Sequence, residues 1–359
     1  MPGQENGWRE ALVEYVNARN EEELLGSAAS YSRVPDPRHR SRLLGRLAAL
    51  SRRPKASRMK PVRSEIRVRL LRRSEKETEA VCDVRLHLLR SFELDVRPWR
   101  EERMETERIW FVHTGKGWRI VRIEPLVFEN QADYWEPMAN AAGGGRFEQT
   151  VGPSVPYLNP QATTAFRPRV YAGPGTAAGW GDGSVEPPKR GARYRREEAV
   201  AYADRWWNEP NPAYEEFEVN CTNFVSQCLF AGGAPMNYTG KRESGWWYKG
   251  RDHGRELWSY SWAVANSLQH YLAHPRAYGL RAEAVESPTQ LMPGDVICYD
   301  WSGTGLFQHN TIVTAFTPEG MPLVNANTVP SRHRYWDYRD SYAWTERTRY
   351  RFYHIADEF

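Results

Sequence analysis

Apolar residues in the first fifty positions recur at the spacing of an α-helix. Trp8, Leu12, Tyr15 and Val16 share one helical face, because residues three or four positions apart are neighbours on a helix. A second series has the same spacing and comprises Leu43, Leu44, Leu47 and Leu50. Prolines at positions 35 and 37 separate the two series, since proline interrupts a helix. Residues 5–50 are therefore predicted to form two helices.

The apolar period changes to two after residue 60. Ile66, Val68 and Leu70 alternate with arginines, and alternation of this kind is typical of β-strands. Further strands are predicted at residues 81–88, 108–113 and 118–123. Helices followed by an antiparallel sheet resemble the cystatin-like or NTF2-like α+β fold. Residues 1–135 are thus predicted to be a smaller N-terminal α+β domain.

Glycine and proline dominate the next segment, residues 136–192. This composition buries too little apolar surface to order a chain, so the segment is predicted to be a linker. Periodic patterns resume at residue 193. Helices are predicted at about 195–207, 220–233 and 261–272, and strands at 295–299, 310–314, 322–326 and 352–355. A helix followed by an antiparallel sheet is the papain-like order, so residues 193–359 are predicted to be a second α+β domain.

Composition and charge narrow the possible environments and partners. The 359 residues are 40% hydrophobic and 26% charged, with a net charge of +4, which gives no strong nucleic-acid signal. The beginning lacks the pattern of a signal peptide, and no apolar run is long enough to span a membrane. Four scattered cysteines suggest no disulfide framework. These features predict a cytoplasmic protein, or a secreted one if a leader has been removed. Nothing indicates the oligomeric state.

One segment is strongly basic. Fourteen arginines and lysines lie between Asp36 and Arg73, against only two acidic residues. Such a run can bind an anionic partner, but a solvated surface is the favoured interpretation. The acidic residues between Glu75 and Glu107 are candidates to neutralise it across the sheet.

Cys221 is the best candidate for a nucleophile. It follows Asn220, a residue suited to the N-cap of a helix, and a thiol in the first helical turn has its pKa lowered by the helix dipole and free amides. The same amides can bind an oxyanion. A buried structural cysteine is the alternative, and it fits Cys82, Cys228 and Cys298 better.

A thiolate hydrolase needs a base and a residue that orients the base. His309 stands before a predicted strand and after a glycine-rich loop, where an imidazole can be both rigid and accessible. Asn325 and Asn327 lie in the following strand and face the same side. Either amide oxygen is a candidate to hold the imidazole.

Several short motifs occur in order along the C-terminal half. They are Tyr194–Ala203, Asn211–Tyr214, Asn220–Leu229 with Ala231–Gly233, Tyr260–Trp262, Pro293–Ile297, and His309 with Ile312–Thr314. Together they resemble the amidase domain family found in many bacilli, a relative of the NlpC/P60 and CHAP cysteine peptidases. The resemblance implies that Cys221 is the nucleophile, that His309 is the base, and that a peptide-like or γ-glutamyl-type amide is the substrate.

Two positions depart from the family pattern. The family usually has Asp before the cysteine and a His-Thr pair on the third strand, where this chain has Asn220 and Asn327–Thr328. Asn327 is therefore expected to be the third catalytic member, with Asn325 as the alternative. Asn220 and Tyr214 are further candidates for supporting the cysteine or the oxyanion.

The remaining candidates concern substrate and cofactor binding. A groove for peptide or glycan is predicted from Trp246, Trp247, Trp262 and Trp301, although core packing explains these residues equally well. No metal-ligand spacing or phosphate loop is present, so no cofactor is expected. Two alternative functions remain. The C-terminal domain can be a catalytically weakened module that binds peptide or glycan through this groove, or the N-terminal domain can be a ligand sensor that gates the hydrolase.

Overall fold

The structure, a computed structural model, describes residues 7–25, 30–53, 61–92, 98–127, 129, 192–252 and 255–359. The predicted linker lies outside these residues except for its last position. The chain forms two compact units. The N-terminal unit comprises Met1–Phe128, Thr317–Glu319 and Val329–Trp344, and the C-terminal unit comprises Glu129–Phe316, Gly320–Thr328 and Thr345–Phe359.

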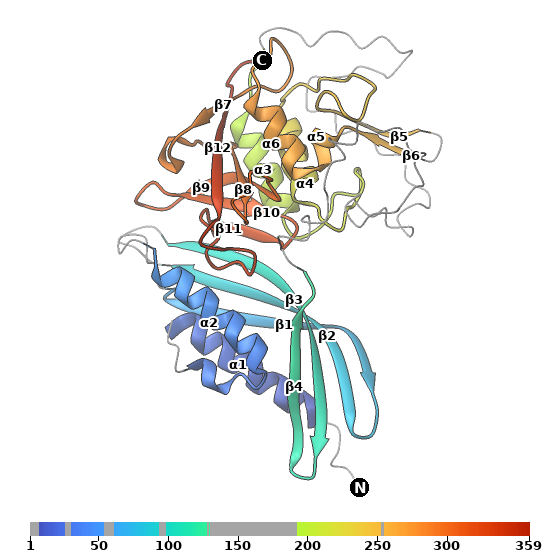
Figure 1. Ribbon diagram of the computed structural model, residues 1–359, viewed down its shortest axis with the longest axis vertical. Helices are drawn as coiled ribbons and strands as arrows, with labels where there is room; N and C mark the ends of the chain where they lie inside the picture. Colours follow the sequence, from blue (N-terminus) through green and yellow to red (C-terminus); the bar gives the residue numbers. More distant parts are fainter. Residues whose placement is uncertain are drawn as a thin grey trace. The chain divides into compact units, whose positions relative to one another are not determined.

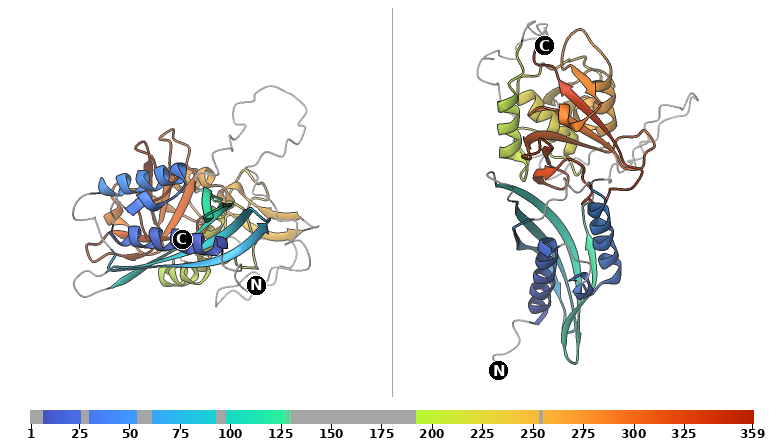
Figure 2. Two further views of the ribbon diagram at one scale, coloured as in Figure 1. Left: turned by 90° about the horizontal axis from the view of Figure 1, so that it is seen from below. Right: turned by 90° about the vertical axis from the view of Figure 1, so that its left-hand side faces the viewer.

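The N-terminal unit has helices packed on one face of an antiparallel sheet (Figures 1 and 2). Its helices are α1 (Gly7–Leu25), the short 3-10 helix η1 (Ser30–Arg33) and α2 (Pro37–Ser51), and its first strands are β1 (Arg63–Glu75), β2 (Glu79–Phe92), β3 (Trp99–Thr114) and β4 (Gly117–Pro125). The predicted apolar face of α1 is buried against Leu86, Ile109 and Phe111 of the sheet. Both N-terminal helices and all the N-terminal strands predicted from periodicity are present.

A segment from the far end of the chain completes this unit. Strand β11 (Ser331–Tyr335) pairs with β3, with Ser331 opposite Arg103. Strand β4 pairs with the same strand further along, from Glu107 to Thr114. The division drawn from the sequence placed Val329–Trp344 in the C-terminal domain, whereas its contacts place it in the N-terminal unit. Strand pairing between residues more than 200 positions apart leaves no mark on local periodicity.

Buried ion pairs hold this segment in place. Asp340 pairs with Arg103 and Arg334, and Asp337 accepts hydrogen bonds from Arg53. Every member of this set is at least nine-tenths buried. Burial alone would raise the pKa of Asp340, but the surrounding guanidinium groups hold it well below its usual range. The carboxylate is therefore charged and paired in the interior of the unit.

Some arginines of the basic run form buried ion pairs inside the N-terminal unit. Arg46 pairs with Glu105, which also pairs with Arg19. Arg19 in turn pairs with Glu107, which accepts a hydrogen bond from Tyr15 at 2.8 Å. Acidic residues of β3 thus neutralise part of the run, as the sequence suggested. This interaction occurs inside the unit and not on its surface.

His39 is expected to make the protein less stable in acid. It is buried beside Arg19, Arg42 and Arg46, and burial followed by the charge of Arg19 holds its pKa well below the usual value. Such a histidine binds a proton only in the unfolded chain, so it lowers the free energy of unfolding as pH falls below about 6.5. We expect a loss of about 1 kcal/mol between pH 7 and 5.5 in urea titrations. His39→Gln should remove this part of the pH dependence; an equal slope in the variant would contradict the prediction.

The C-terminal unit places helices against an antiparallel part of the β-sheet (Figure 1). The sheet order is β10 (Pro322–Ala326), β9 (His309–Phe316), β8 (Val296–Asp300), β12 (Arg349–Ile355) and β7 (Ala282–Val285). Helices α3 (Arg196–Trp206) and α4 (Cys221–Ala231) pack together and against β9 and β10. Strands β5 (Tyr248–Asp252) and β6 (Arg255–Trp258) form a separate pair.

The motif Pro293–Ile297 has a structural role, because the carboxylate of Asp295 joins several segments. This carboxylate accepts hydrogen bonds from Arg196 (2.7 Å), from the backbone N–H of Ile355 (2.9 Å) and from that of Met292 (2.7 Å). It therefore ties the beginning of α3, the turn before β8 and the end of β12 together. The buried carboxylate makes several charge-assisted bonds at once, which is the arrangement that makes burial of a charge tolerable.

The element types confirm the α+β class predicted from the sequence. The predicted third helix is in fact two, α5 (Tyr260–Ala263) and α6 (Ala265–Ala273), because Val264 is extended between them. The 3-10 turn η4 (Pro288–Gln290) precedes β8. Among the described residues, no helix is both long enough and apolar enough to cross a membrane.

Candidate active site

Cys221 is the first residue of α4, and Gly232 caps the other end of that helix. The prediction that the side chain of Asn220 caps the helix backbone is wrong. Its Oδ1 accepts instead from Nδ2 of Asn223 at 2.9 Å, and its Nδ2 donates to Oδ1 of Asn327 at 2.7 Å. Asn220 thus links the beginning of α4 to the segment after β10.

A second asparagine fixes the same helical turn. Nδ2 of Asn223 also donates to the carbonyl oxygen of Glu215 at 2.9 Å, while its Oδ1 accepts from Nε1 of Trp262 at 2.8 Å. The amide therefore satisfies three partners from three different segments. This network defines where the thiol of Cys221 lies.

His309 is the first residue of β9, and its neighbours come from β8. It is paired in register with Tyr299. The indole of Trp301 stacks on the imidazole, with ring centroids 5.8 Å apart and planes inclined by 28°. His309 is fully buried. Two aromatic rings therefore restrict the orientation of the imidazole.

The loop before His309 is organised by Asp300. Its carboxylate accepts from the backbone N–H of Gly303 at 2.8 Å and from that of Gly305 at 2.7 Å. Both glycines have positive φ, +71° and +89°, a region that other residues rarely adopt. A Cβ at Gly303 would also lie 2.6 Å from the carbonyl oxygen of Arg347. The loop is therefore built by a buried carboxylate and two glycines.

The environment of Cys221 favours the thiolate. Burial by itself would raise the pKa, but the charge of His309 and hydrogen bonds from His309, from the Asn310 backbone and from Thr222 outweigh it. The net result lowers the pKa of Cys221 to about 7. A thiol with such a pKa is partly ionised at neutral pH.

The other three cysteines have the opposite property. All are buried. Burial raises the pKa of Cys82 to about 11 and raises the pKa values of Cys228 and Cys298 well above the usual value. Cys221 therefore differs from the others in charge environment and not in exposure.

The two candidate orienting residues both make hydrogen bonds to α3 or to its C-terminal end. Asn327 donates from Nδ2 to the carbonyl oxygens of Trp206 (3.1 Å) and Trp207 (2.8 Å), and its Oδ1 accepts from Asn220. The hydrogen bonds of Asn325 include one to Asp204 and one from Thr314, both at 2.9 Å. The structure thus places Asn327 beside the N-terminus of α4, where its bond to Asn220 holds the residue that precedes the helix.

Three neighbours of the site were not singled out from the sequence. Thr328 accepts a hydrogen bond from the backbone N–H of Cys221 through Oγ1, at 3.1 Å. Oγ1 of Thr222 lies 3.7 Å from the sulfur and accepts from Nδ2 of Asn310 at 3.0 Å. Each residue is adjacent in sequence to a predicted site residue, so adjacency within the motifs is the signal that would have found them.

The four tryptophans proposed to line a groove are all at least 98% buried. Trp246 donates to Ser226 and Trp247 donates to the carbonyl oxygen of Ser244. Trp262 anchors Asn223, and Trp301 flanks His309, as described above. These positions support the packing interpretation. Tyr214 packs against Tyr248 and Trp262, at 5.1 and 6.1 Å between ring centroids.

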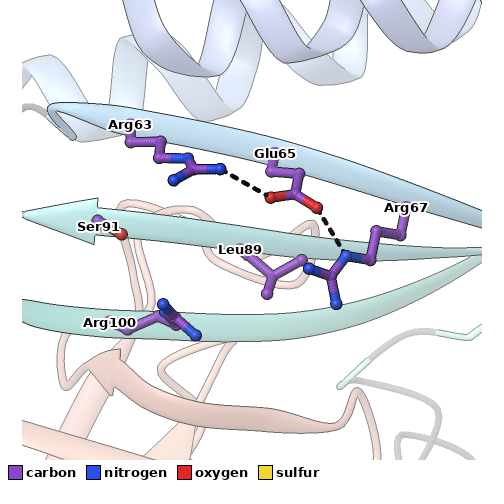
Figure 3. Close-up of a pocket in the computed structure, with 6 residues that line it drawn as sticks. All are labelled: Arg63, Glu65, Arg67, Leu89, Ser91 and Arg100. Atoms are coloured by element: carbon purple, nitrogen blue, oxygen red, sulfur yellow. Dashed lines mark hydrogen bonds and ion pairs between the residues drawn. The ribbon is translucent and has the colours of Figure 1, made fainter.

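A separate small pocket lies on the sheet of the N-terminal unit (Figure 3). It has a volume of about 120 Å³ and is lined by Arg63, Glu65, Arg67, Leu89, Ser91 and Arg100. Glu65 already pairs with two of the arginines, Arg67 at 2.6 Å and Arg63 at 3.5 Å. The pocket is smaller than ordinary ligand sites, which enclose about 300 Å³ or more.

The part of the chain that the structure describes has no cluster of three or more potential metal ligands.

Comparisons with known proteins identify relatives of the C-terminal part. Residues 193–353 match the family described as "Putative amidase domain". The uncharacterized protein YhbB of Bacillus subtilis (strain 168) is 55% identical over 169 residues, which are 47% of this chain and 52% of YhbB. The chain thus spans about half the length of this curated relative. No solved structure matches. By sequence, residues 193–353 are therefore similar to an amidase-domain family.

Proposed function

We propose that the protein is a cysteine-dependent amide hydrolase acting on peptide-like or γ-glutamyl-type amides. The observation that carries the proposal is the place of Cys221 at the start of α4 beside His309 of β9, whose charge and hydrogen bond lower the pKa of the thiol against the effect of burial. A thiolate with an adjacent imidazole is the arrangement that nucleophilic thiol catalysis requires. The similarity to an amidase-domain family supports hydrolysis of a C–N bond.

The proposed reaction uses the two groups in turn. The Cys221 thiolate attacks the amide carbon, and the carbonyl π electrons move to oxygen. The tetrahedral intermediate collapses by breaking the C–N bond, and the leaving amine takes a proton from the His309 imidazolium. Water, deprotonated by the neutral imidazole, then hydrolyses the acyl-enzyme. A helix that begins with the cysteine, followed by a strand that begins with the histidine, supports a papain-like arrangement.

Asn327 has a different role in this proposal from the one first expected. Because its amide joins Asn220 to the carbonyl oxygens at the end of α3, Asn327 positions the beginning of α4. Trp301 and Tyr299 flank the imidazole and restrict its rotation.

Selective alkylation tests the proposal. At pH 7 about half of Cys221 is thiolate, against about one part in 10⁴ of Cys82. The lower nucleophilicity of a low-pKa thiolate reduces the advantage to about 10²-fold. Iodoacetamide should therefore label Cys221 about 10²-fold faster than Cys82, as measured by peptide mass spectrometry.

The matched control is His309→Ala. Removing the imidazole removes the main influence that lowers the pKa of Cys221. Labelling at pH 7 should therefore slow, and the pH at which the labelling rate of Cys221 is half-maximal should rise. Equal labelling of all four cysteines in the unchanged protein would refute the activated thiolate. Unchanged labelling in the variant would refute the role of His309.

One observation favours a second function, a weakened module that binds amide-containing ligands without turnover. The backbone N–H of Cys221, a natural oxyanion donor, is already bonded to Thr328. Such a module would bind a peptide without hydrolysing it. Fast labelling of Cys221 combined with no release of p-nitroaniline from γ-glutamyl- or alanyl-p-nitroanilide would favour this function.

A further inference from the structure

Thr328 occupies a hydrogen-bond donor that thiol hydrolysis requires. In a helix the first backbone N–H groups have no partner within the helix, and the amide of the nucleophile is well placed to stabilise an oxyanion. Here the N–H of Cys221 donates to Oγ1 of Thr328 at 3.1 Å, and Thr328 is 5% exposed. An oxyanion within hydrogen-bond distance of the same N–H would need the space that Oγ1 fills.

We propose that the side chain of Thr328 fills the oxyanion site in the resting protein and leaves it when substrate binds. This inference rests on the proposed function. As the sulfur–carbon bond forms, the negative oxygen takes over the hydrogen bond from the Cys221 N–H, and Thr328 loses it. No atom or electron is exchanged with Thr328, so it competes with the intermediate without taking part in the chemistry.

The side chain of threonine limits how the site can be cleared. The Cβ carries a hydroxyl, a methyl group and a hydrogen, and rotation about χ1 exchanges them between three staggered positions. Of the two alternative rotamers, one puts the methyl group where the hydroxyl was, and the other puts the hydrogen there. Only one rotamer therefore opens the oxyanion site.

The backbone of Thr328 is restrained by the residue before it. Asn327 is held by Asn220 and by the end of α3. A change of rotamer is consequently a cheaper way to clear the site than a movement of the chain, and it is the step we assign to substrate binding.

Two variants and two measurements test the inference. Thr328→Ala removes the competing hydroxyl and should raise kcat/KM for γ-glutamyl- or alanyl-p-nitroanilide about 5- to 10-fold, the size of one ordinary hydrogen bond. Thr328→Ser keeps the hydroxyl but has two clearing rotamers in place of one, so it should raise kcat/KM about twofold. Iodoacetamide labelling of Cys221, which forms no oxyanion, should stay within about twofold in both variants.

The outcomes separate this inference from the proposed function. A fall in kcat/KM for Thr328→Ala at unchanged labelling would show that the hydroxyl contributes to catalysis. It would overturn the proposal that the hydroxyl competes with the oxyanion. An unchanged kcat/KM would show that the hydroxyl does not compete. If Thr328→Ala fails to fold, an unchanged or lowered kcat/KM in Thr328→Ser decides against the inference. Slow labelling of Cys221 in the unchanged protein would instead refute the proposed function.

Discussion

Replacing Cys221 by alanine is expected to lower the hydrolysis of γ-glutamyl- or alanyl-p-nitroanilide by about 10⁴-fold or more. The variant loses the only thiol with a lowered pKa among the four cysteines. Removing the nucleophile of a thiol or hydroxyl hydrolase lowers kcat by a factor of this order. His309→Ala should cost a similar factor. The double variant should be no worse than either single variant, because residues that act as a unit are not additive.

Cys228→Ala is the matched control for this experiment. Cys228 lies in the same helix and is equally buried, but its pKa is raised well above the usual value. Its replacement should leave kcat within about threefold and act mainly on stability. Equal losses in Cys221→Ala and Cys228→Ala would point to a structural effect and contradict nucleophilic catalysis by Cys221.

Asp340→Asn is expected to lower the free energy of unfolding by about 3–5 kcal/mol, the usual effect of breaking a buried ion pair from one side. Asp340 is the carboxylate shared by Arg103 and Arg334, both of which are fully buried. The variant leaves these guanidinium groups without their compensating charge. Urea titration at pH 7, followed by circular dichroism, measures the change.

Asp357→Asn provides the comparison for an exposed pair. Asp357 is 64% exposed and pairs with Arg196 at 2.9 Å, so its replacement should cost at most about 1 kcal/mol. Similar small effects of Asp340→Asn and Asp357→Asn would show that the buried network does not hold the N-terminal unit together. The pKa of Asp340 is held below its usual range, so the contribution of this carboxylate is present above about pH 4 and is lost as pH falls through the lowered value.

The position of Val329–Trp344 changes how the N-terminal unit is interpreted. The sequence suggested a ligand sensor with its own pocket. In the structure the space between helices and sheet holds Asp340 and Tyr342 of the chain itself, and the ring of Tyr342 lies under the guanidinium of Arg46 at 4.0 Å. The interior of the unit is thus filled in part by side chains from the far end of the chain.

The sequence by itself determined the element types and singled out Cys221 and His309 as the candidate pair. Helical spacing in residues 8–16 and alternation in residues 66–70 depend only on which side chains face a core, so the element types follow from local pattern. Cys221 could be distinguished from the other cysteines because a helix start is a local feature. His309 was found because it opens a strand after a glycine-rich loop.

Only the tertiary structure decided the partners of each polar group. Asn220 does not cap its helix, because Asn223 and Asn327 satisfy its amide from other segments. The amide of Cys221 is bonded by Thr328, more than a hundred positions away in the sequence. An amide or hydroxyl has many equivalent partners in a chain, and which one it takes is fixed by the folded packing; a periodic apolar face, in contrast, needs only water on one side and a core on the other.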